Sequence, residues 1–337
     1  MMKEAQLYIH LEGQGVHCQL CAHGCKIPEG KFGFCGVRQN IKGILYTHNY
    51  AKLVAANPDP VEKKPLYHFL PGSSTFSIAS AGCNFRCGFC QNWEISQLNF
   101  FNQHPGKPFR ADKVIKLAKQ NSCRSIAYTY TEPTIYFEFA LETAKLAKAA
   151  GLRNIFVTNG YMSRQAISLL SPYLDAANVD LKFFKNSSYQ RICSAKLEPV
   201  LDSIQSLSDA GVWVEITTLV IPGENDTPQE LSGIAKFIAG VNKDIPWHIS
   251  GFHADYKFSD YSSTPESILK QAYELGRTQR LHYVYAGNVN VWGQDTFCSG
   301  CRKPIIKREG FKVTEAHIVG DKCVFCQTAL PGVFSPG

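Results

Sequence analysis

The sequence predicts an α/β protein built around a parallel β-sheet. Short runs rich in β-branched and aromatic residues recur along the chain, segments with helical periodicity separate them, and capping residues mark the helix ends. We expect strands at Thr75–Ala79, Ser125–Tyr130, Asn154–Thr158, Asn178–Phe183, Val212–Ile221, Trp247–Phe252 and Tyr283–Tyr285. We expect helices at Asp112–Gln120, Thr134–Ala150, Ser163–Leu174, Glu198–Ala210, Thr227–Ala239 and Pro265–Leu275. This order gives βα units followed by a last strand, and in a parallel βα barrel the carboxyl ends of the strands carry the site.

Length and composition indicate a globular protein with one large domain and small appendages. The chain has 337 residues, of which 45% are hydrophobic and 19% charged, and this balance excludes a disordered chain. No apolar run approaches the roughly 20 residues that span a bilayer. The first residues also lack the apolar core of a secretion signal. We therefore expect no membrane association and a cytoplasmic location.

The first cysteine group lies in residues 1–45, which we expect to form a separate module. Cys18, Cys21, Cys25 and Cys35 stand in a glycine-rich segment. Four thiolates would satisfy one tetrahedral zinc ion or one fully ligated iron–sulfur cluster, and the spacing alone does not choose between them. A redox pair of thiols with two bystanders is the alternative. A closed metal site of this kind would be structural or would carry electrons.

A proline-rich segment leads into the predicted sheet. Residues Ile44 to Ala56 have a β-like pattern, and prolines at positions 60, 65 and 71 argue against a helix in the segment after them. We expect an ordered loop over Asp59–Gly72, with Lys63 and Lys64 exposed to solvent. Contact of these two lysines with an anionic ligand is the alternative.

The second cysteine group comes directly after the first predicted strand of the sheet. Cys83, Cys87 and Cys90 have the spacing C-x3-C-x2-C. Three thiolates on one loop can hold three irons of a [4Fe-4S] cube and leave the fourth iron without a protein ligand. An open metal position is typical of a reactive site. Three free thiols, or part of a zinc site, are the alternatives.

Polar residues recur where the later strands end. A single Glu-Pro or Asn-Gly is usually a turn, but recurrence at the same end of successive strands indicates a site. The candidates are Thr131, Glu132, Asn159, Asp180, Lys182, His248 and His253.

The third cysteine group lies in residues 291–337. Cys298 and Cys301 form one C-x2-C pair, and Cys323 and Cys326 form another. Paired motifs at this spacing predict a structural zinc ribbon, since four thiolates complete a tetrahedron. A rubredoxin-like iron site is the alternative because iron accepts the same ligands.

The chain resembles the radical S-adenosylmethionine (SAM) superfamily, in its pyruvate formate-lyase activating enzyme-like branch, and more narrowly the radical SAM enzyme of the AmmeMemoRadiSam system. The spacing of Cys83, Cys87 and Cys90 carries this resemblance, with Phe89 and Asn92 beside them. Further matching stretches are Gly33–Arg38, Glu62–Gly72, Tyr128–Pro133, Asp180–Lys182, Pro246–His248 and Tyr283–Asn288. The resemblance implies a partial (β/α)6 barrel over residues 46–290.

The resemblance also implies roles for individual residues. Cys83, Cys87 and Cys90 match the ligands of the SAM-binding [4Fe-4S] cluster. Thr131 and Glu132 match a Gly-Gly-Glu-Pro stretch that receives the methionine amino group, although both glycines are absent here. Asn159 matches a residue near the ribose, and Val157 stands where the family has an Asp. The remaining matches to SAM-contacting positions are Phe89, Asp180, Lys182 and His253.

The expected activity is reductive cleavage of SAM to methionine and a 5′-deoxyadenosyl radical, which abstracts hydrogen from an unidentified substrate. One hypothesis is a glycyl radical enzyme activase, and a second is modification of a small molecule, another protein or RNA. A nucleic-acid-binding or electron-transfer metalloprotein is the alternative of another class. The net charge of +7 permits nucleic acid but is spread without a basic stripe. A flavodoxin or ferredoxin would be the electron donor.

Overall fold

The central element is one open eight-stranded sheet with a crossover helix after most strands. The computed structural model describes residues 2–97, 105–288 and 292–335. The strand order is β16-β15-β14-β13-β12-β11-β9-β8, so β16 and β8 are the edges. The strands are β8 (Ala55–Pro60), β9 (Ser74–Ala79), β11 (Ser125–Tyr128), β12 (Arg153–Thr158), β13 (Ala176–Asp180), β14 (Trp213–Val220), β15 (Trp247–Gly251) and β16 (Val284–Gly287). All neighbours pair in parallel except β8 and β9. The predicted α/β fold with a mostly parallel sheet is confirmed.

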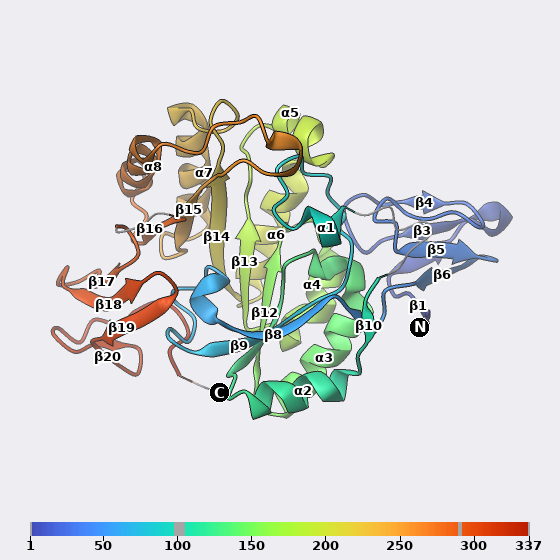
Figure 1. Cartoon of the computed structure of the whole chain (residues 1–337), viewed down its shortest axis with the longest axis horizontal. Helices are drawn as coiled ribbons and strands as arrows, with labels where there is room; N and C mark the ends of the chain where they lie inside the picture. The colour runs from blue at the N-terminus through green and yellow to red at the C-terminus, as the bar shows by residue number, and fades with distance from the viewer. Residues whose placement is uncertain (1, 98–104, 289–291, 336–337) are drawn as a thin grey trace.

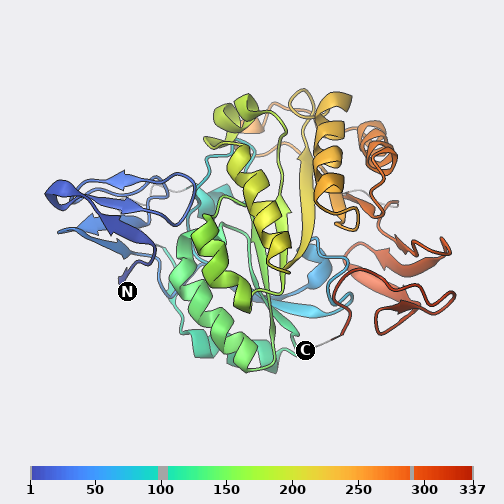
Figure 2. The same cartoon turned by 180° about the vertical axis from the view of Figure 1, so that it is seen from behind.

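The helices lie where their periodicity and capping residues place them. They are α2 (Ala111–Gln120), α3 (Phe137–Ala149), α4 (Arg164–Leu170), α6 (Glu198–Asp209), α7 (Pro228–Val241) and α8 (Glu266–Thr278), with short helices α1 (Trp93–Ser96) and α5 (Asn186–Ser188). The hydroxyl of Ser163 accepts a hydrogen bond from Ala166 N, and that of Thr227 accepts one from Glu230 N. Figure 2 shows helices ranged over one face of the sheet. Buried side chains such as Trp247 and Ile216 fill the space between the two layers.

Strand β8 departs from the expected loop over Asp59–Gly72. It includes Asp59 and Pro60 and runs antiparallel to β9, with Asp59 opposite Thr75. Pro58 and Pro60 are compatible with this strand because it is an edge, where the missing proline N–H leaves no partner strand unpaired. The loop prediction is therefore wrong for these two residues. A 3-10 turn, Val61–Lys63, comes after the strand.

The two outer cysteine groups lie in small β modules on opposite sides of the central sheet (Figure 1). The N-terminal module contains the sheets β1-β6-β5 and β2-β3-β4. Its strands are β1 (Lys3–Glu4), β2 (Tyr8–His10), β3 (Val16–Cys18), β4 (Lys26–Ile27), β5 (Arg38–Ile41) and β6 (Ile44–Thr47), and the pair β7 (Lys52–Leu53) and β10 (Lys107–Pro108) lies beyond them.

The C-terminal module contains the sheet β17-β18-β19 and the hairpin β20-β21. Its strands are β17 (Thr296–Phe297), β18 (Pro304–Glu309), β19 (Lys312–Ala316), β20 (Ile318–Val319) and β21 (Lys322–Cys323). The predicted boundary between residues 290 and 291 lies outside the described residues. No helix of the described chain is both long and apolar enough to cross a membrane.

Candidate active site

The three-thiol loop comes after β9 at the carboxyl edge of the sheet. Backbone hydrogen bonds hold it from three directions: Gly82 N donates to Ile95 O, Arg86 N to Cys193 O, and Lys257 N to Gly88 O. Burial raises the pKa of the Cys83 and Cys90 thiols. Thiols of this kind ionise when a metal binds them.

All ten residues predicted to bind the cluster or SAM line one cavity of about 750 Å³. They are Cys83, Cys87, Cys90, Phe89, Thr131, Glu132, Asn159, Asp180, Lys182 and His253. They come from the ends of β9, β11, β12, β13 and β15 and from the adjoining loops. The parallel register brings these ends together, although the residues are up to 170 positions apart, from Cys83 to His253.

Glu132 connects two strand ends through its carboxylate. The group accepts hydrogen bonds from Thr134 N at 2.9 Å, Thr158 Oγ1 at 2.8 Å and Asn159 N at 2.8 Å. The side chain is buried, and burial raises the pKa of Glu132 although these donors oppose the shift. Its oxygens are therefore already engaged, and the Glu132 side chain positions the segment around it.

Asn159 supports the three-thiol loop. Its Nδ2 donates to Asn84 Oδ1 at 2.7 Å, and its Oδ1 accepts from Tyr161 N at 3.1 Å. The Asn159 side chain thus fixes the residue that comes after Cys83.

Asp180 and Lys182 form an ion pair beside the loop. Lys182 Nζ lies 2.8 Å from Asp180 Oδ2 and 5.6 Å from the centre of the Phe89 ring. The pKa of Lys182 is raised, because Asp180 and the nearby thiols outweigh the burial that opposes its charge. Elsewhere in the cavity wall, His253 Nε2 contacts Gln91 Nε2 at 2.9 Å.

Lys63 and Lys64 line the same cavity. Both contact one carboxylate: Lys63 Nζ lies 3.0 Å from Asp59 Oδ1, and Lys64 Nζ lies 2.8 Å from Asp59 Oδ2. The expected exposure is wrong for Lys64, which is buried over the Tyr130 ring. Burial lowers the pKa of Lys64 to about 8, with Asp59 opposing the shift.

A second buried carboxylate, that of Glu215 on β14, connects several residues beside the cavity. It accepts hydrogen bonds from Tyr67 N, His68 N and Trp213 Nε1 and contacts His248 Nε2 at 2.7 Å. Burial alone would raise the pKa of Glu215, but His248 and the other partners bring it below its ordinary value. Predicted residue His248 therefore faces the cavity while its ring is fixed by Glu215.

The C-terminal module forms part of the cavity wall. Gln294, Gly310 and Phe311 line it together with residues of the loop after β8. Buried Arg308 of β18 joins the two segments: its Nη2 donates to Tyr67 O at 2.8 Å, and its Nε lies 3.6 Å from Glu62 Oε1.

Cys193 approaches the loop without any signal in the sequence. Its Sγ lies 3.5 Å from Cys87 Sγ, and it ends the π-helical turn Tyr189–Cys193. Cys123, which belongs to none of the three cysteine groups, is also buried and does not line the cavity, as is common for a core thiol.

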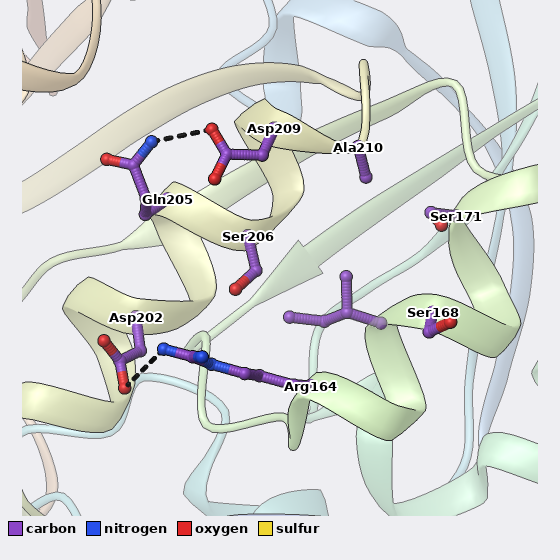
Figure 3. A pocket seen from close by; sticks show the side chains of 9 residues that line it. Arg164, Ser168, Ser171, Asp202, Gln205, Ser206, Asp209 and Ala210 are labelled. Carbon is purple, nitrogen blue, oxygen red and sulfur yellow. Dashed lines mark hydrogen bonds and ion pairs between the residues drawn. The ribbon is translucent and has the colours of Figure 1, made fainter.

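Another hollow of about 360 Å³ lies between α4 and α6 (Figure 3). Arg164 and Asp202 face each other there at 3.7 Å. Its polar groups are exposed or half-buried, and none of the predicted site residues lines it.

The four thiols of the C-terminal group converge. The Sγ atoms of Cys298, Cys301, Cys323 and Cys326 all lie within 4.8 Å of one another, which fits a metal ion. The thiols of Cys18, Cys21, Cys25 and Cys35 line a separate cavity in the N-terminal module.

Comparisons with known proteins agree with this site. The profile of the radical SAM superfamily matches residues 77–238. An uncharacterised protein of Methanocaldococcus jannaschii is 39% identical over 96% of this chain and 98% of its own length. The pyruvate formate-lyase-activating enzyme of Listeria monocytogenes is 22% identical over 53% of this chain and 77% of its own. The crystal structure of Streptococcus suis SuiB bound to S-adenosylmethionine shares the fold, with a TM-score of 0.52 and 12% identity over 71% of this chain and 56% of that one.

The chain belongs to the radical SAM superfamily. Within that superfamily, it is an enzyme related to the pyruvate formate-lyase activating enzymes. Such an enzyme uses a [4Fe-4S] cluster to cleave SAM reductively, and the resulting 5′-deoxyadenosyl radical abstracts hydrogen from a substrate, here unidentified.

Proposed function

We propose that Cys83, Cys87 and Cys90 bind three irons of the catalytic cluster and leave the fourth iron for SAM. The observation that carries this is their place in one cavity with Asp180, Lys182 and the ends of β11 and β12. Three thiolates on one loop suit a cluster with one open iron. In this arrangement Lys182 would face the SAM carboxylate as a charge-assisted partner.

The remaining SAM contacts depend on which polar atoms are still available. Because the carboxylate of Glu132 is engaged by Thr134, Thr158 and Asn159, we assign the methionine amino group to backbone oxygens near Thr131. Phe89 and His253, together with Asn159, border the space left for the nucleoside.

Anaerobic reconstitution tests the ligand assignment. The Cys87→Ala variant should lose SAM cleavage to 5′-deoxyadenosine and the iron and sulfide of this cluster. The Cys123→Ala variant is the matched control, because Cys123 is also a buried thiol but lies outside the cavity. Full cleavage by the Cys87→Ala variant would contradict the assignment.

For the substrate, we propose a glycine residue of a partner protein, as in an activase. The relationship to an enzyme named for activating pyruvate formate-lyase supports this. A flavodoxin or ferredoxin would supply the electrons.

The activase proposal is tested with pyruvate formate-lyase, as the glycyl radical enzyme, and with its Gly→Ala variant. Only the first should give a glycine-centred EPR signal after incubation with SAM and dithionite. Rapid SAM cleavage without that signal in either sample would contradict the proposal.

A second candidate is a small anionic substrate. Lys63 and Lys64 share the single carboxylate of Asp59, so one positive charge of this group is unbalanced at the cavity wall. A panel of deuterated carboxylates and phosphate esters tests this: one member should transfer deuterium to 5′-deoxyadenosine, and the Lys63→Gln variant should lose that transfer. A panel without transfer would exclude these substrates.

We also propose that residues 1–45, 46–290 and 291–337 form three functional units and that the last binds zinc. A Zn–S bond of about 2.3 Å places the sulfurs of a tetrahedral site about 3.8 Å apart. The Cys298–Cys326 and Cys301–Cys323 sulfur pairs, at 3.5 and 3.8 Å, support this.

A further inference from the structure

The N-terminal thiols form a site that differs from the C-terminal one. Cys18 ends β3, Cys21 and Cys25 lie in the turn before β4, and Cys35 precedes β5. All four line a single cavity, whose other walls are mainly the apolar side chains of Leu20, Ile27 and Ile135. None of the four forms a disulfide. Free thiols directed into a mostly apolar cavity suit a bound metal centre.

The spacing of the thiols distinguishes a single ion from a cluster. Four sulfurs around one zinc ion lie about 3.8 Å apart. Sulfurs on the corners of an iron–sulfur cube are farther apart, because an iron–iron edge separates the atoms that they bind. Among the described residues, only the C-terminal group has three or more ligand atoms all within 4.8 Å. The N-terminal group is wider, as is the three-thiol loop proposed to hold the catalytic cluster.

An unpartnered donor in the same cavity points to an acceptor that binds there. Arg38 lines the cavity and is 1% exposed, yet its Nε has no hydrogen-bond partner among the described residues. Its Nη2 is engaged by Glu138 at 2.7 Å. A buried N–H without a partner is costly, and a thiolate or sulfide of a bound cluster would accept its hydrogen bond.

We propose that Cys18, Cys21, Cys25 and Cys35 ligate a second [4Fe-4S] cluster, with Arg38 donating to one of its sulfurs. All four corners of this cluster have protein ligands, so it offers no iron to SAM. The proposal is independent of the assignment of the catalytic cluster.

The test uses the full chain, reconstituted anaerobically with iron and sulfide in the presence of zinc. The Cys83→Ala/Cys87→Ala/Cys90→Ala variant should retain about four irons and four sulfides per chain. Its reduced EPR signal should not change when SAM is added. Zinc at this site in place of iron and sulfide would overturn the proposal.

Wild-type protein provides a second measurement if that variant does not fold. It should hold about eight irons, falling to about four in the Cys18→Ser/Cys21→Ser variant. The Cys298→Ser/Cys326→Ser variant is the matched control and should keep all its iron. A wild type with about four irons and an EPR signal that changes with SAM would overturn this proposal and leave the catalytic assignment intact. Bound iron whose EPR signal does not change with SAM would instead contradict the catalytic assignment.

Discussion

Gly88 lies where the three-thiol loop meets a ring of another segment. A methyl group on Gly88 would lie 2.6 Å from Phe258 Cε1. Lys257, the neighbour of Phe258, also bonds to the Gly88 carbonyl. The loop is therefore packed against the 3-10 turn Tyr256–Phe258 with no space for a side chain.

The Gly88→Ala variant should consequently displace the loop. We expect at least a tenfold loss of SAM cleavage together with lower iron content, measured after reconstitution. The Gly240→Ala variant is the control, because a methyl group there meets nothing within 4 Å. That variant should keep full activity and gain up to about 1 kcal/mol of stability from improved helix propensity.

Glu132 gives a second prediction at the residue scale. In the Glu132→Gln variant an amide N–H₂ replaces one acceptor oxygen among donors from Thr134, Thr158 and Asn159. We expect a loss of about 1–3 kcal/mol in the free energy of unfolding, measured with urea. The half-exposed Glu142 is the control, and Glu142→Gln should change stability much less. Equal effects of the two variants would contradict the role given to Glu132.

A group of side chains on one loop could be predicted from the sequence, but contacts between distant segments could not. The C-x3-C-x2-C spacing predicted that Cys83, Cys87 and Cys90 act together, because all three lie on one short segment, and they do line one cavity. Cys193 is 106 positions from Cys87, and only the packing of the π-helical turn brings the sulfurs together. The sequence predicts an exposed Lys64 because it places Asp59 in a loop. The ion pair with Asp59 allows the burial of Lys64, and only the structure reveals that pair.

At the scale of elements, a buried ion pair joins the N-terminal module to the central domain. Arg38 on β5 contacts Glu138 on α3 through Nη2 at 2.7 Å, with both side chains nearly inaccessible. Removing one partner leaves the other charge buried and unpaired, which costs about 3–5 kcal/mol.

We therefore expect the Arg38→Met variant to lose about that amount in urea unfolding of the metal-free chain. The Arg38→Met/Glu138→Leu variant should recover most of the loss, since no unpaired charge remains. Arg110 is the control: it pairs with Asp112 at the exposed surface, and Arg110→Met should be without measurable effect. An Arg38→Met variant with unchanged stability would show that the ion pair does not join these two elements.

His68 makes the contact between the loop after β8 and the C-terminal module sensitive to pH. Its Nδ1–H donates to Pro331 O at 2.8 Å, and its Nε2 accepts from Tyr285 Oη at 2.6 Å. Burial lowers the pKa of His68 to about 4. Because the unfolded chain takes up this proton near pH 6.5, the unfolded state holds more protons between those values and stability falls as the pH falls.

The expected loss between pH 7 and pH 4 is on the order of 3 kcal/mol for this one group. Urea unfolding of the metal-free wild type and of the His68→Gln variant at several pH values measures it. The variant should have lower stability at pH 7 and a shallower decrease on acidification. Parallel pH profiles would contradict the assignment to His68.

The order and type of the elements could be predicted, since each predicted helix and each predicted strand has a counterpart in the structure. Strand β8 could not, because its prolines at positions 58 and 60 are signals for a loop. Only its position at the sheet edge makes such a strand possible, and that position is a property of the whole sheet.

At the scale of the whole molecule, the C-terminal module is part of the wall of the active-site cavity. Arg308 and the segment around Val333 anchor it: Leu70 N donates to Val333 O, Val333 N to His68 O, and Arg308 Nη2 to Tyr67 O. Phe311 and Gly310 then reach the cavity.

Loss of the metal proposed for the C-terminal thiols should therefore alter the cavity as well as the module. The Cys298→Ser/Cys326→Ser variant is expected to lose the zinc proposed for this site and to show faster hydrogen exchange in residues 61–72 and 304–316. Exchange in α4, which does not line this cavity, is the internal reference and should not change. Faster exchange confined to the module itself would contradict a shared wall.

The pairing of Phe69 with Val333 also has a consequence for biosynthesis. A ribosome produces residues 66–70 long before Val333, so this side of the cavity stays incomplete until the C-terminal module has been synthesised. A nascent or prematurely terminated product could acquire the three-thiol loop yet would lack one side of the chamber that confines the radical. The wall of the cavity is thus complete only after the C-terminal module has folded against residues 66–70.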